Sequence, residues 1–212
     1  MLKDEMMKKV GVIGGAGYVG GELLRILLQH PEVEVSCVTS RSNAGEYIYR
    51  IHPNLRGFTD LKFIPPVVSK ITDKCDIVFS AAPHGAMVKF TKEIVETGVK
   101  VIDLSADYRL KDPFLYEKYY GFRHPYPDLL EKSVYGLPEI HRNEIKNAFL
   151  VACPGCTATS AILSLAPLLA IMEQQVIVVD AMEGSSAGGS SPRMASHHPE
   201  RANIIRPYKP TG

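Results

Sequence analysis

The chain has 212 residues, of which 45% are hydrophobic and 22% are charged, a composition typical of a globular protein with a sizeable core. Its formal net charge of +1 gives no general reason to expect nucleic acid or an anionic membrane as a partner. The first apolar run, residues 10–13, is too short for an export signal, and no stretch is long enough for a membrane span. We therefore expect a cytoplasmic protein.

Strand and helix patterns alternate along most of the chain. We expect strands at residues 9–13, 33–38, 76–80, 99–103 and 149–152, and helices at residues 18–29, 86–97 and 157–171. In the first helix, Val19, Leu23 and Leu27 recur at the spacing of one helical face. Repeated βα units predict a parallel sheet with helices on both faces, so the expected fold class is α/β with a Rossmann-type sheet.

Three segments depart from this alternation. Residues 108–134 are rich in aromatic, proline and charged residues, which favours irregular surface structure with one short helix. A helix is expected to begin at residue 137. A strand at residues 175–180 is expected to lead into the glycine and serine stretch 184–191.

A glycine-rich turn joins the first expected strand to the first helix, which is the context of a dinucleotide-binding loop. Gly14 and Gly17 would allow a tight turn and close approach of the backbone to a pyrophosphate, and Gly20 would allow close helix packing. The spacing GxxGxxG departs from the commonest form of this loop, and a purely structural turn is the alternative. The residues expected to bind the cofactor here are Gly14, Ala16, Gly17, Tyr18, Val19 and Gly20.

The end of the second expected strand indicates which dinucleotide binds. Arg41 lies about 20 residues beyond Gly20, where an acidic residue would indicate NAD. Its guanidinium, with the hydroxyls of Ser40 and Ser42, can instead pair with the 2′-phosphate of NADP. We therefore expect NADP as the cofactor, and a solvated Arg41 is the alternative.

The segments that follow the third and fourth expected strands add to the same site, because ligands of open α/β sheets bind at such strand ends. We expect Pro83 to line the cofactor site. His84 is expected to bond to backbone or to line the same pocket, with acid or base catalysis as the alternative. Asp107 and Arg109 are spaced to pair with each other, and the alternative for Arg109 is contact with a substrate phosphate.

Four cysteines, Cys37, Cys75, Cys153 and Cys156, suit a reducing compartment. Cys37 and Cys75 fall in expected buried segments and are interpreted as small core residues. Cys156 stands at the head of the last expected helix, where unpaired N–H groups and the helix dipole favour a nucleophilic sulfur. A redox dithiol or half of a zinc site at Cys153 and Cys156 is the alternative. We predict no metal ligand, since no other CxxC is present to complete a zinc site.

Several motifs together resemble the N-acetyl-γ-glutamyl-phosphate reductase family. They are the glycine turn at 14–20, PHG at 83–85, DLSADYRL at 103–110, YGLPE at 135–139 and PGC at 154–156. The match runs along nearly the whole chain, and LSADYRL and YGLPE are far more specific than a glycine loop. GSS at 184–186 and SHHPER at 196–201 resemble the branch that acts on carrier-bound aminoadipyl or glutamyl phosphate in lysine and arginine biosynthesis.

The resemblance implies NADPH-dependent reduction of an acyl phosphate to a semialdehyde through a thioester on Cys156. The substrate would be N-acetylated or bound to a small acidic carrier protein, and the enzyme is expected to be a homo-oligomer when complete. CPGCTAT at 153–159 differs from the NPGCYPT of the acetyl-glutamyl enzymes, which fits the carrier branch. Four basic residues near the end would meet such a carrier, or else lie in an ordinary solvated loop: Arg193, Arg201, Arg206 and Lys209.

The resemblance also implies two domains. Residues 1–152 would form the NADP-binding Rossmann domain, and residues 153–212 the first part of an incomplete α+β substrate domain whose remainder follows in family members. The catalytic histidine of the family is expected just after a segment like residues 209–212, so we expect a fragment or truncated product with little or no turnover alone. His197 and His198 are not expected to replace that histidine.

Three other functions stay open. An aspartate-semialdehyde dehydrogenase runs the same reaction type with a different cysteine motif, a thiol redox protein would use Cys153 and Cys156, and an inactive NADP-binding module would form no thioester. The sequence also leaves open the glutamyl or aminoadipyl substrate, its acetyl or carrier group and the oligomeric state.

Overall fold

The computed structural model describes residues 7–173 and 176–207. Its centre is a seven-stranded sheet in the order β3-β2-β1-β4-β5-β7-β6, and each neighbouring pair of strands is parallel. The strands are β1 (Lys8–Ile13), β2 (Val33–Thr39), β3 (Phe63–Ile64), β4 (Ile77–Ser80), β5 (Lys100–Asp103), β6 (Val134–Tyr135) and β7 (Leu150–Ala152). The parallel α/β sheet predicted from the sequence is confirmed.

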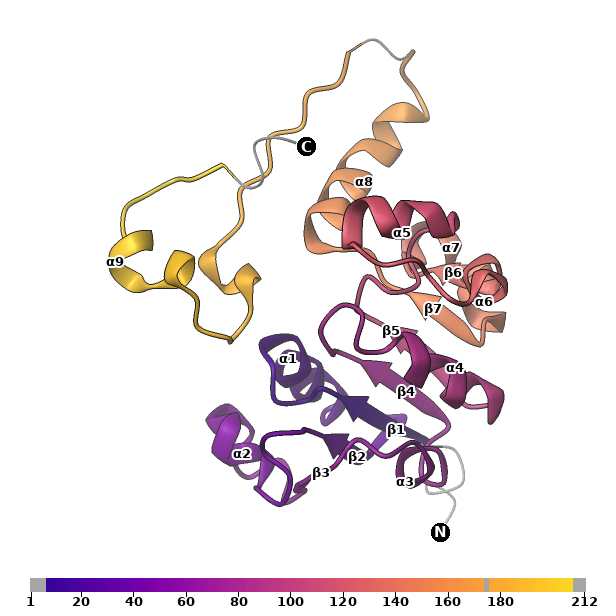
Figure 1. Ribbon diagram of the computed structural model, residues 1–212, viewed down its shortest axis with the longest axis vertical. Helices are drawn as coiled ribbons and strands as arrows, with labels where there is room; N and C mark the ends of the chain where they lie inside the picture. Colours follow the sequence, from indigo (N-terminus) through magenta and orange to yellow (C-terminus); the bar gives the residue numbers. More distant parts are fainter. Residues whose placement is uncertain (1–6, 174–175, 208–212) are drawn as a thin grey trace.

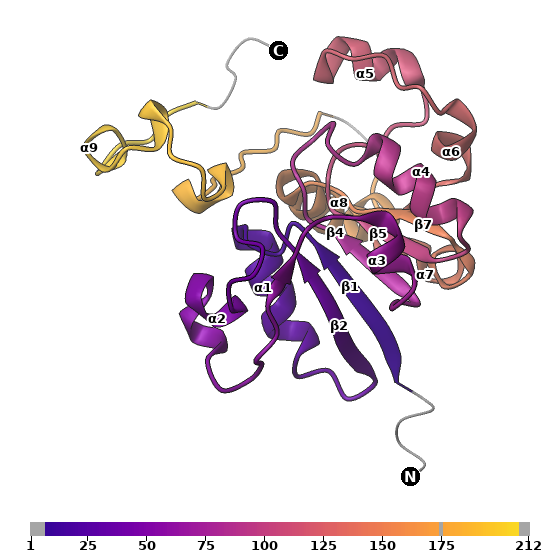
Figure 2. The same ribbon diagram turned by 60° about the horizontal axis from the view of Figure 1, so that its bottom comes forward.

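Helices cover both faces of this sheet (Figures 1 and 2). The helices in the described residues are α1 (Tyr18–Leu27), α2 (Ile48–Ile51), α3 (Val68–Thr72), α4 (Val88–Glu96), α5 (Pro113–Tyr120), α6 (Pro127–Lys132), α7 (Pro138–Asn147), α8 (Cys156–Leu169) and α9 (His198–Arg201). Of these, α9 lies away from the sheet (Figures 1 and 2). Short 3-10 turns lie at Pro53–Leu55, Ser185–Gly188 and Met194–Ser196. In the part of the chain that the structure describes, no helix is both long and apolar enough to cross a membrane.

Two hydrophobic clusters lie on opposite faces of the sheet, because successive side chains of a strand point to opposite sides. Val10 and Val12 of β1 belong to the cluster that contains Leu24 and Leu27 of α1. Ile13 belongs to the other cluster, which includes buried residues of α3 and α4. The sheet edge that carries the strand ends is therefore held rigidly from both sides.

Cys37 and Cys75 are buried in the second cluster, with their sulfur atoms 3.5 Å apart. Gly11 of β1 makes room for them, because a Cβ there would lie 2.9 Å from the Cys75 Sγ and 3.2 Å from the Cys37 Sγ. The interpretation of both cysteines as core residues is confirmed.

The segment 108–134 contains two helices, α5 and α6, instead of the one short helix expected. Its prolines open these helices, since Pro113 and Pro127 occupy first-turn positions where no N–H is needed. Asp112 caps α5 by accepting a hydrogen bond from the Phe114 N–H at 2.8 Å. Periodicity also misses β3, β6, α2 and α3, which are too short to show a period.

The prediction of a strand at residues 175–180 is wrong for those of its residues that the structure describes. Gln175 lies outside the described residues, and residues 176–180 form no strand. Val176 and Val178 are 88% and 87% exposed. A β-strand is stable only beside a partner strand, and the described residues offer none at this segment.

Candidate active site

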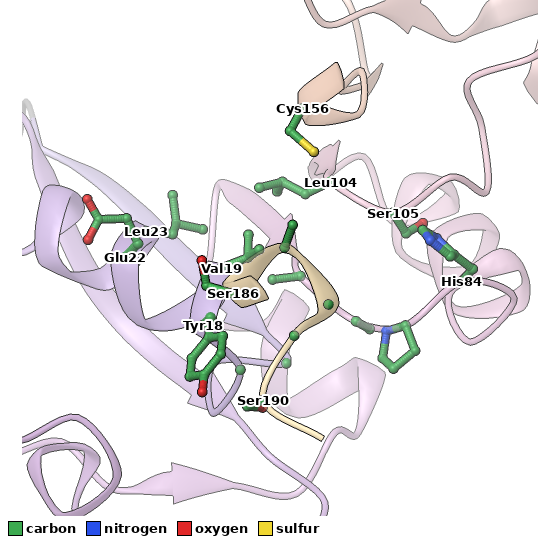
Figure 3. Close-up of a pocket in the computed structure, with 18 of the residues that line it drawn as sticks. Tyr18, Val19, Glu22, Leu23, His84, Leu104, Ser105, Cys156, Ser186 and Ser190 are labelled. Carbon is green, nitrogen blue, oxygen red and sulfur yellow. The ribbon is translucent and has the colours of Figure 1, made fainter. Parts of the chain in front are cut away.

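The carboxyl ends of β1, β2, β4 and β5 open into one cleft of about 1720 Å³. Residues at the start of α8 and within 178–193 line it as well (Figure 3). Ligands of open parallel sheets bind at this edge. Small-molecule pockets usually measure about 300–1,000 Å³, so this cleft has room for a dinucleotide and a second reactant.

The glycine turn lies in this cleft and depends on two close backbone contacts. Gly14 has φ of +75°, and a Cβ there would lie 2.8 Å from the Ala81 carbonyl oxygen. A Cβ on Gly20 would lie 2.7 Å from both the Gly14 carbonyl oxygen and the Gly15 Cα. Gly17 is the N-cap of α1, whose first N–H groups have no acceptor within the helix. The turn therefore presents backbone donors at short range, as a pyrophosphate requires.

The structure brings together nearly all residues predicted to bind the cofactor. The cleft is lined by Gly14, Ala16, Gly17, Tyr18, Val19, Ser40, Arg41, Ser42 and Pro83. Gly20 instead packs α1 against the turn, which is the role predicted for it. Contact of these residues with a cofactor stays a prediction.

The loop after β2 holds the side chains predicted to meet a 2′-phosphate. Ser40 is buried, and its hydroxyl oxygen accepts hydrogen bonds from the Asn43 backbone N–H at 3.2 Å and from the Asn43 side-chain amide at 3.1 Å. Arg41 is exposed on this tightened loop. It therefore supplies a cation to the cleft beside the glycine turn.

His84 and Asp107 join the loops that follow β4 and β5. The His84 Nδ1 accepts a hydrogen bond from the Ala106 N–H at 3.0 Å, and His84 lines the cleft, as predicted for a histidine held by backbone. The Asp107 carboxylate accepts hydrogen bonds from the Gly85 N–H at 2.6 Å and the Met87 N–H at 3.2 Å, just before α4. Asp107 therefore fixes the start of that helix.

Arg109 holds the turn that precedes Cys156. Its Nε donates to the Cys153 carbonyl oxygen at 2.5 Å, and its Nη2 donates to the Leu104 carbonyl oxygen at 2.8 Å. The predicted pairing of Asp107 with Arg109 is wrong, because the two side chains bind backbone groups of different loops. Contact of Arg109 with a substrate phosphate stays a prediction.

Cys156 is the first residue of α8, and its side chain extends into the cleft across from Tyr18 and Val19 (Figure 3). The thiol donates a hydrogen bond to the Glu183 Oε1 at 3.0 Å, and the Thr157 hydroxyl donates to the same oxygen. These two donors hold the pKa of the Glu183 carboxyl below its usual value. The predicted nucleophile and the predicted cofactor turn thus line one cleft.

Glu183 is a site residue that the sequence analysis misses. The only local signal is an acidic side chain directly before the glycine and serine stretch. Of the predicted basic residues, Arg193 lines the cleft, while Arg206 forms an ion pair with Glu200 at 3.0 Å. Arg201 is half-buried in α9, and Lys209 lies outside the described residues.

Cys153 differs from Cys156 in its surroundings. Burial, reinforced by the charge of Asp103, raises the pKa of the Cys153 thiol to about 11. A thiol that stays protonated is a poor attacking group. This difference favours Cys156 acting alone over a dithiol formed by the two cysteines.

Asp103 is expected to make the stability of the chain depend on pH. Burial raises the pKa of its carboxyl to about 6, despite the hydrogen bonds it accepts from Ser105. The native state therefore holds this proton more tightly than the unfolded state, whose Asp pKa is about 3.9, and stability falls by about 3 kcal/mol between about pH 4 and about pH 6. Asp103→Asn should remove that fall in urea unfolding curves. Asp128→Asn, at an exposed position, is the control, and parallel curves for wild type and Asp103→Asn would contradict the assignment.

The fold and the cleft define an α/β protein of the dinucleotide-binding class, with a cysteine and a glycine turn in one cleft. Residues 9–148 match the family model described as semialdehyde dehydrogenase, NAD binding domain. Residues 156–212 match the model described as semialdehyde dehydrogenase, dimerisation domain. The chain belongs to the semialdehyde dehydrogenase family, and residues 9–148 are its NAD(P)-binding domain.

Curated relatives resemble the chain over almost all of its length. The putative LysW-L-2-aminoadipate/LysW-L-glutamate phosphate reductase of Nitrosopumilus maritimus is 55% identical over 204 residues, which are 95% of this chain and 58% of the relative. The LysW-L-2-aminoadipate/LysW-L-glutamate phosphate reductase of Saccharolobus solfataricus is 52% identical over an alignment of 213 positions, which covers 100% of this chain and 60% of the relative. The chain thus spans about 60% of the length of these relatives.

Solved structures share the fold at low identity. Aspartate semialdehyde dehydrogenase with NADP from Candida albicans superposes with a TM-score of 0.57 at 20% identity, over 77% of this chain and 47% of that one. Aspartate semialdehyde dehydrogenase II complexed with ASA from Vibrio cholerae gives a TM-score of 0.53 at 20% identity, over 78% of this chain and 47% of that one.

Proposed function

We propose that this protein reduces an acyl phosphate to a semialdehyde with NADPH, through a thioester on Cys156, in lysine or arginine biosynthesis. The observation that carries the proposal is that Cys156 and the glycine turn line the same cleft. The names of the relatives support aminoadipate or glutamate phosphate on the carrier LysW as substrate, in preference to an N-acetylated one.

The residues present fit a dinucleotide. Gly14 and Gly17 place no side chain between the backbone and a pyrophosphate at their two positions, and the Ala16 N–H has no acceptor among the residues described. Arg41 supports NADP over NAD, since it lies where a 2′-phosphate would need a positive partner. When bound, the reduced nicotinamide would supply the hydride that converts the thioester to the aldehyde.

The chain supplies the nucleophile and the groups that hold it. The Cys156 thiol first loses its proton. The thiolate then attacks the acyl carbonyl, phosphate leaves with the electrons of the broken C–O bond, and the acyl group remains on sulfur as a thioester. The first N–H groups of α8 have no helical acceptors and are placed to stabilise the negative oxygen that develops in this step. Arg109 keeps the turn before α8 in place through its bond to the Cys153 carbonyl oxygen.

The position of Glu183 supports a place for the substrate beside Cys156. Its carboxylate touches the Cys156 thiol at 3.0 Å, and the acyl group must take up a position equally close to the sulfur. Substrate binding therefore displaces the carboxylate, which also removes a negative charge from beside the attacking sulfur.

The division of the chain follows the same proposal. Residues 1–152 form the NADP-binding domain, and residues 153–212 contribute the first part of the substrate domain. The match of residues 156–212 to a dimerisation domain supports a homo-oligomer. Arg193 and Arg201 are the basic side chains proposed to meet an acidic carrier, and the cytoplasmic location stays a prediction.

Trapping of the thioester tests the function. The whole protein is incubated with acyl phosphate without NADPH, and the peptide that contains Cys156 is measured by mass spectrometry. We expect the acyl mass with carrier-bound aminoadipyl or glutamyl phosphate, and little with N-acetylglutamyl or aspartyl phosphate. A preference for aspartyl phosphate would favour aspartate-semialdehyde dehydrogenase, and NADPH binding without any thioester would favour an inactive module.

A further inference from the structure

His52, which does not line the cleft, contacts the backbone of the glycine turn. The His52 Nε2 lies 2.7 Å from the Gly15 carbonyl oxygen. The backbone of His52 is itself fixed, since its N–H donates to the Ile48 carbonyl oxygen at 2.9 Å and its carbonyl oxygen accepts from the Leu55 N–H at 2.9 Å. Ile48 and Leu55 are fully buried core residues. The ring is therefore anchored to the core and not to a mobile surface loop.

The same ring packs against α1. A Cβ on Gly21 would lie 2.5 Å from the Cε1 and the Nδ1 of His52, so only glycine leaves space for the ring at this position. Both ribbon views place α2, which ends just before His52, beside α1 (Figures 1 and 2). The two neighbouring glycines thus have different roles. Gly20 leaves space for the backbone of the glycine turn, and Gly21 leaves space for the His52 ring.

The contact with Gly15 sets the direction of the next N–H group. A trans peptide group is planar, and its C=O and N–H point in opposite directions. The described residues contain no cis peptide bond. Because the Gly15 carbonyl points to His52, the Ala16 N–H points away from the ring. Ala16 lines the cleft, and its N–H has no acceptor among the described residues.

A second bond fixes the preceding peptide group. The Gly15 N–H donates to the Thr39 carbonyl oxygen at the end of β2, at 3.0 Å. Gly15 is therefore held on both sides, by β2 through its N–H and by His52 through its carbonyl. Rotation of the peptide between Gly15 and Ala16 would break the bond to His52.

We propose that His52 is a positioning residue for the dinucleotide, which aims the Ala16 N–H at the pyrophosphate by holding the Gly15 carbonyl. This inference rests on the proposed binding of NADPH in the cleft. Because the Gly15 oxygen only accepts, His52 donates from Nε2, and both the neutral Nε2-protonated ring and the doubly protonated ring can do so.

The test compares variants that separate the shape of the ring from its donor. His52→Phe keeps a ring but removes the N–H, whereas His52→Gln restores an amide N–H at a similar reach from the backbone. Calorimetric titration of NADPH is expected to give a Kd raised about tenfold or more in His52→Phe, since a hydrogen bond to a charged group is lost. His52→Gln is expected to recover most of that affinity.

Adenosine 2′-monophosphate is the matched control ligand, because it lacks the pyrophosphate. Its Kd should stay within about twofold of wild type in both variants. Gly21→Ala is the second variant and should weaken NADPH selectively as well, because its methyl group displaces the ring. It also tests the proposal if His52→Phe fails to fold.

The possible results distinguish a failure of the His52 proposal from a failure of the proposed function. Failure of wild type to bind NADPH while it binds NADH would overturn the cofactor proposal, and the same variants titrated with NADH would then test His52. Equal dinucleotide affinity in wild type and His52→Phe would overturn the role of His52. An equal loss of affinity for NADPH and for adenosine 2′-monophosphate in a folded variant would also overturn it, because that result indicates general damage to the site.

Discussion

Cys156→Ala in the whole protein is expected to lower the rate of acyl phosphate reduction by more than about a thousandfold, which is the scale of losing a covalent nucleophile. In the proposed mechanism, the sulfur at the start of α8 is the group that accepts the acyl chain, and it lines the same cleft as the glycine turn. Steady-state oxidation of NADPH measures the loss, and mass spectrometry should find no acyl group on the variant.

Cys153→Ala is the matched control, since it removes the neighbouring thiol but not the proposed nucleophile. In the wild type, the pKa of the Cys153 thiol is raised to about 11. We therefore expect a modest change in rate when this thiol is removed. NADPH should bind to the Cys156→Ala variant with the affinity of wild type. Activity retained in Cys156→Ala would contradict the assignment of the nucleophile. A large loss in Cys153→Ala as well as in Cys156→Ala would favour dithiol chemistry, which needs both sulfurs.

Gly20→Ala is expected to weaken NADPH binding by more than about a hundredfold, because two or more hydrogen bonds to a charged group lose their alignment. The added Cβ would lie 2.7 Å from the Gly14 carbonyl oxygen and the Gly15 Cα, and both are backbone atoms that cannot move aside cheaply. Helix α1 must then move away from the turn. Calorimetric titration with NADPH measures the affinity, and differential scanning calorimetry should show a lower Tm.

Gly17→Ala separates crowding from the general cost of replacing glycine. A Cβ on Gly17 would meet only the Gly14 carbonyl oxygen, at 3.8 Å, which is ordinary contact. We expect this variant to keep the Tm of the unliganded wild type. If Gly20→Ala kept both its Tm and its affinity for NADPH, the close packing of α1 on the turn would not be needed for binding.

The sequence allowed prediction of those parts of the site that depend on neighbours along the chain. The glycine turn, Ser40 to Ser42 and Pro83 follow strands whose apolar runs are easy to recognise, and parallel strands bring their carboxyl ends to one edge. Cys156 could be placed for the same reason, because PGC stands between an expected strand and an expected helix.

The remaining parts depend on contacts between distant residues. Glu183 meets Cys156 across 27 positions, and His52 meets Gly15 across 37. The nearby partner expected for Asp107 was wrong because two backbone N–H groups 20 and 22 residues away offer a better-placed set of donors. No spacing rule identifies such partners, since they are set by which loops the sheet brings together.

The four thiols differ enough in their surroundings to give the protein a natural attachment point. Cys37 and Cys75 are buried next to Gly11, and Cys153 is partly buried. Cys156 alone among the four is exposed. A maleimide dye added to the folded protein should therefore label position 156 selectively. Its emission would then report when molecules enter or leave that cleft.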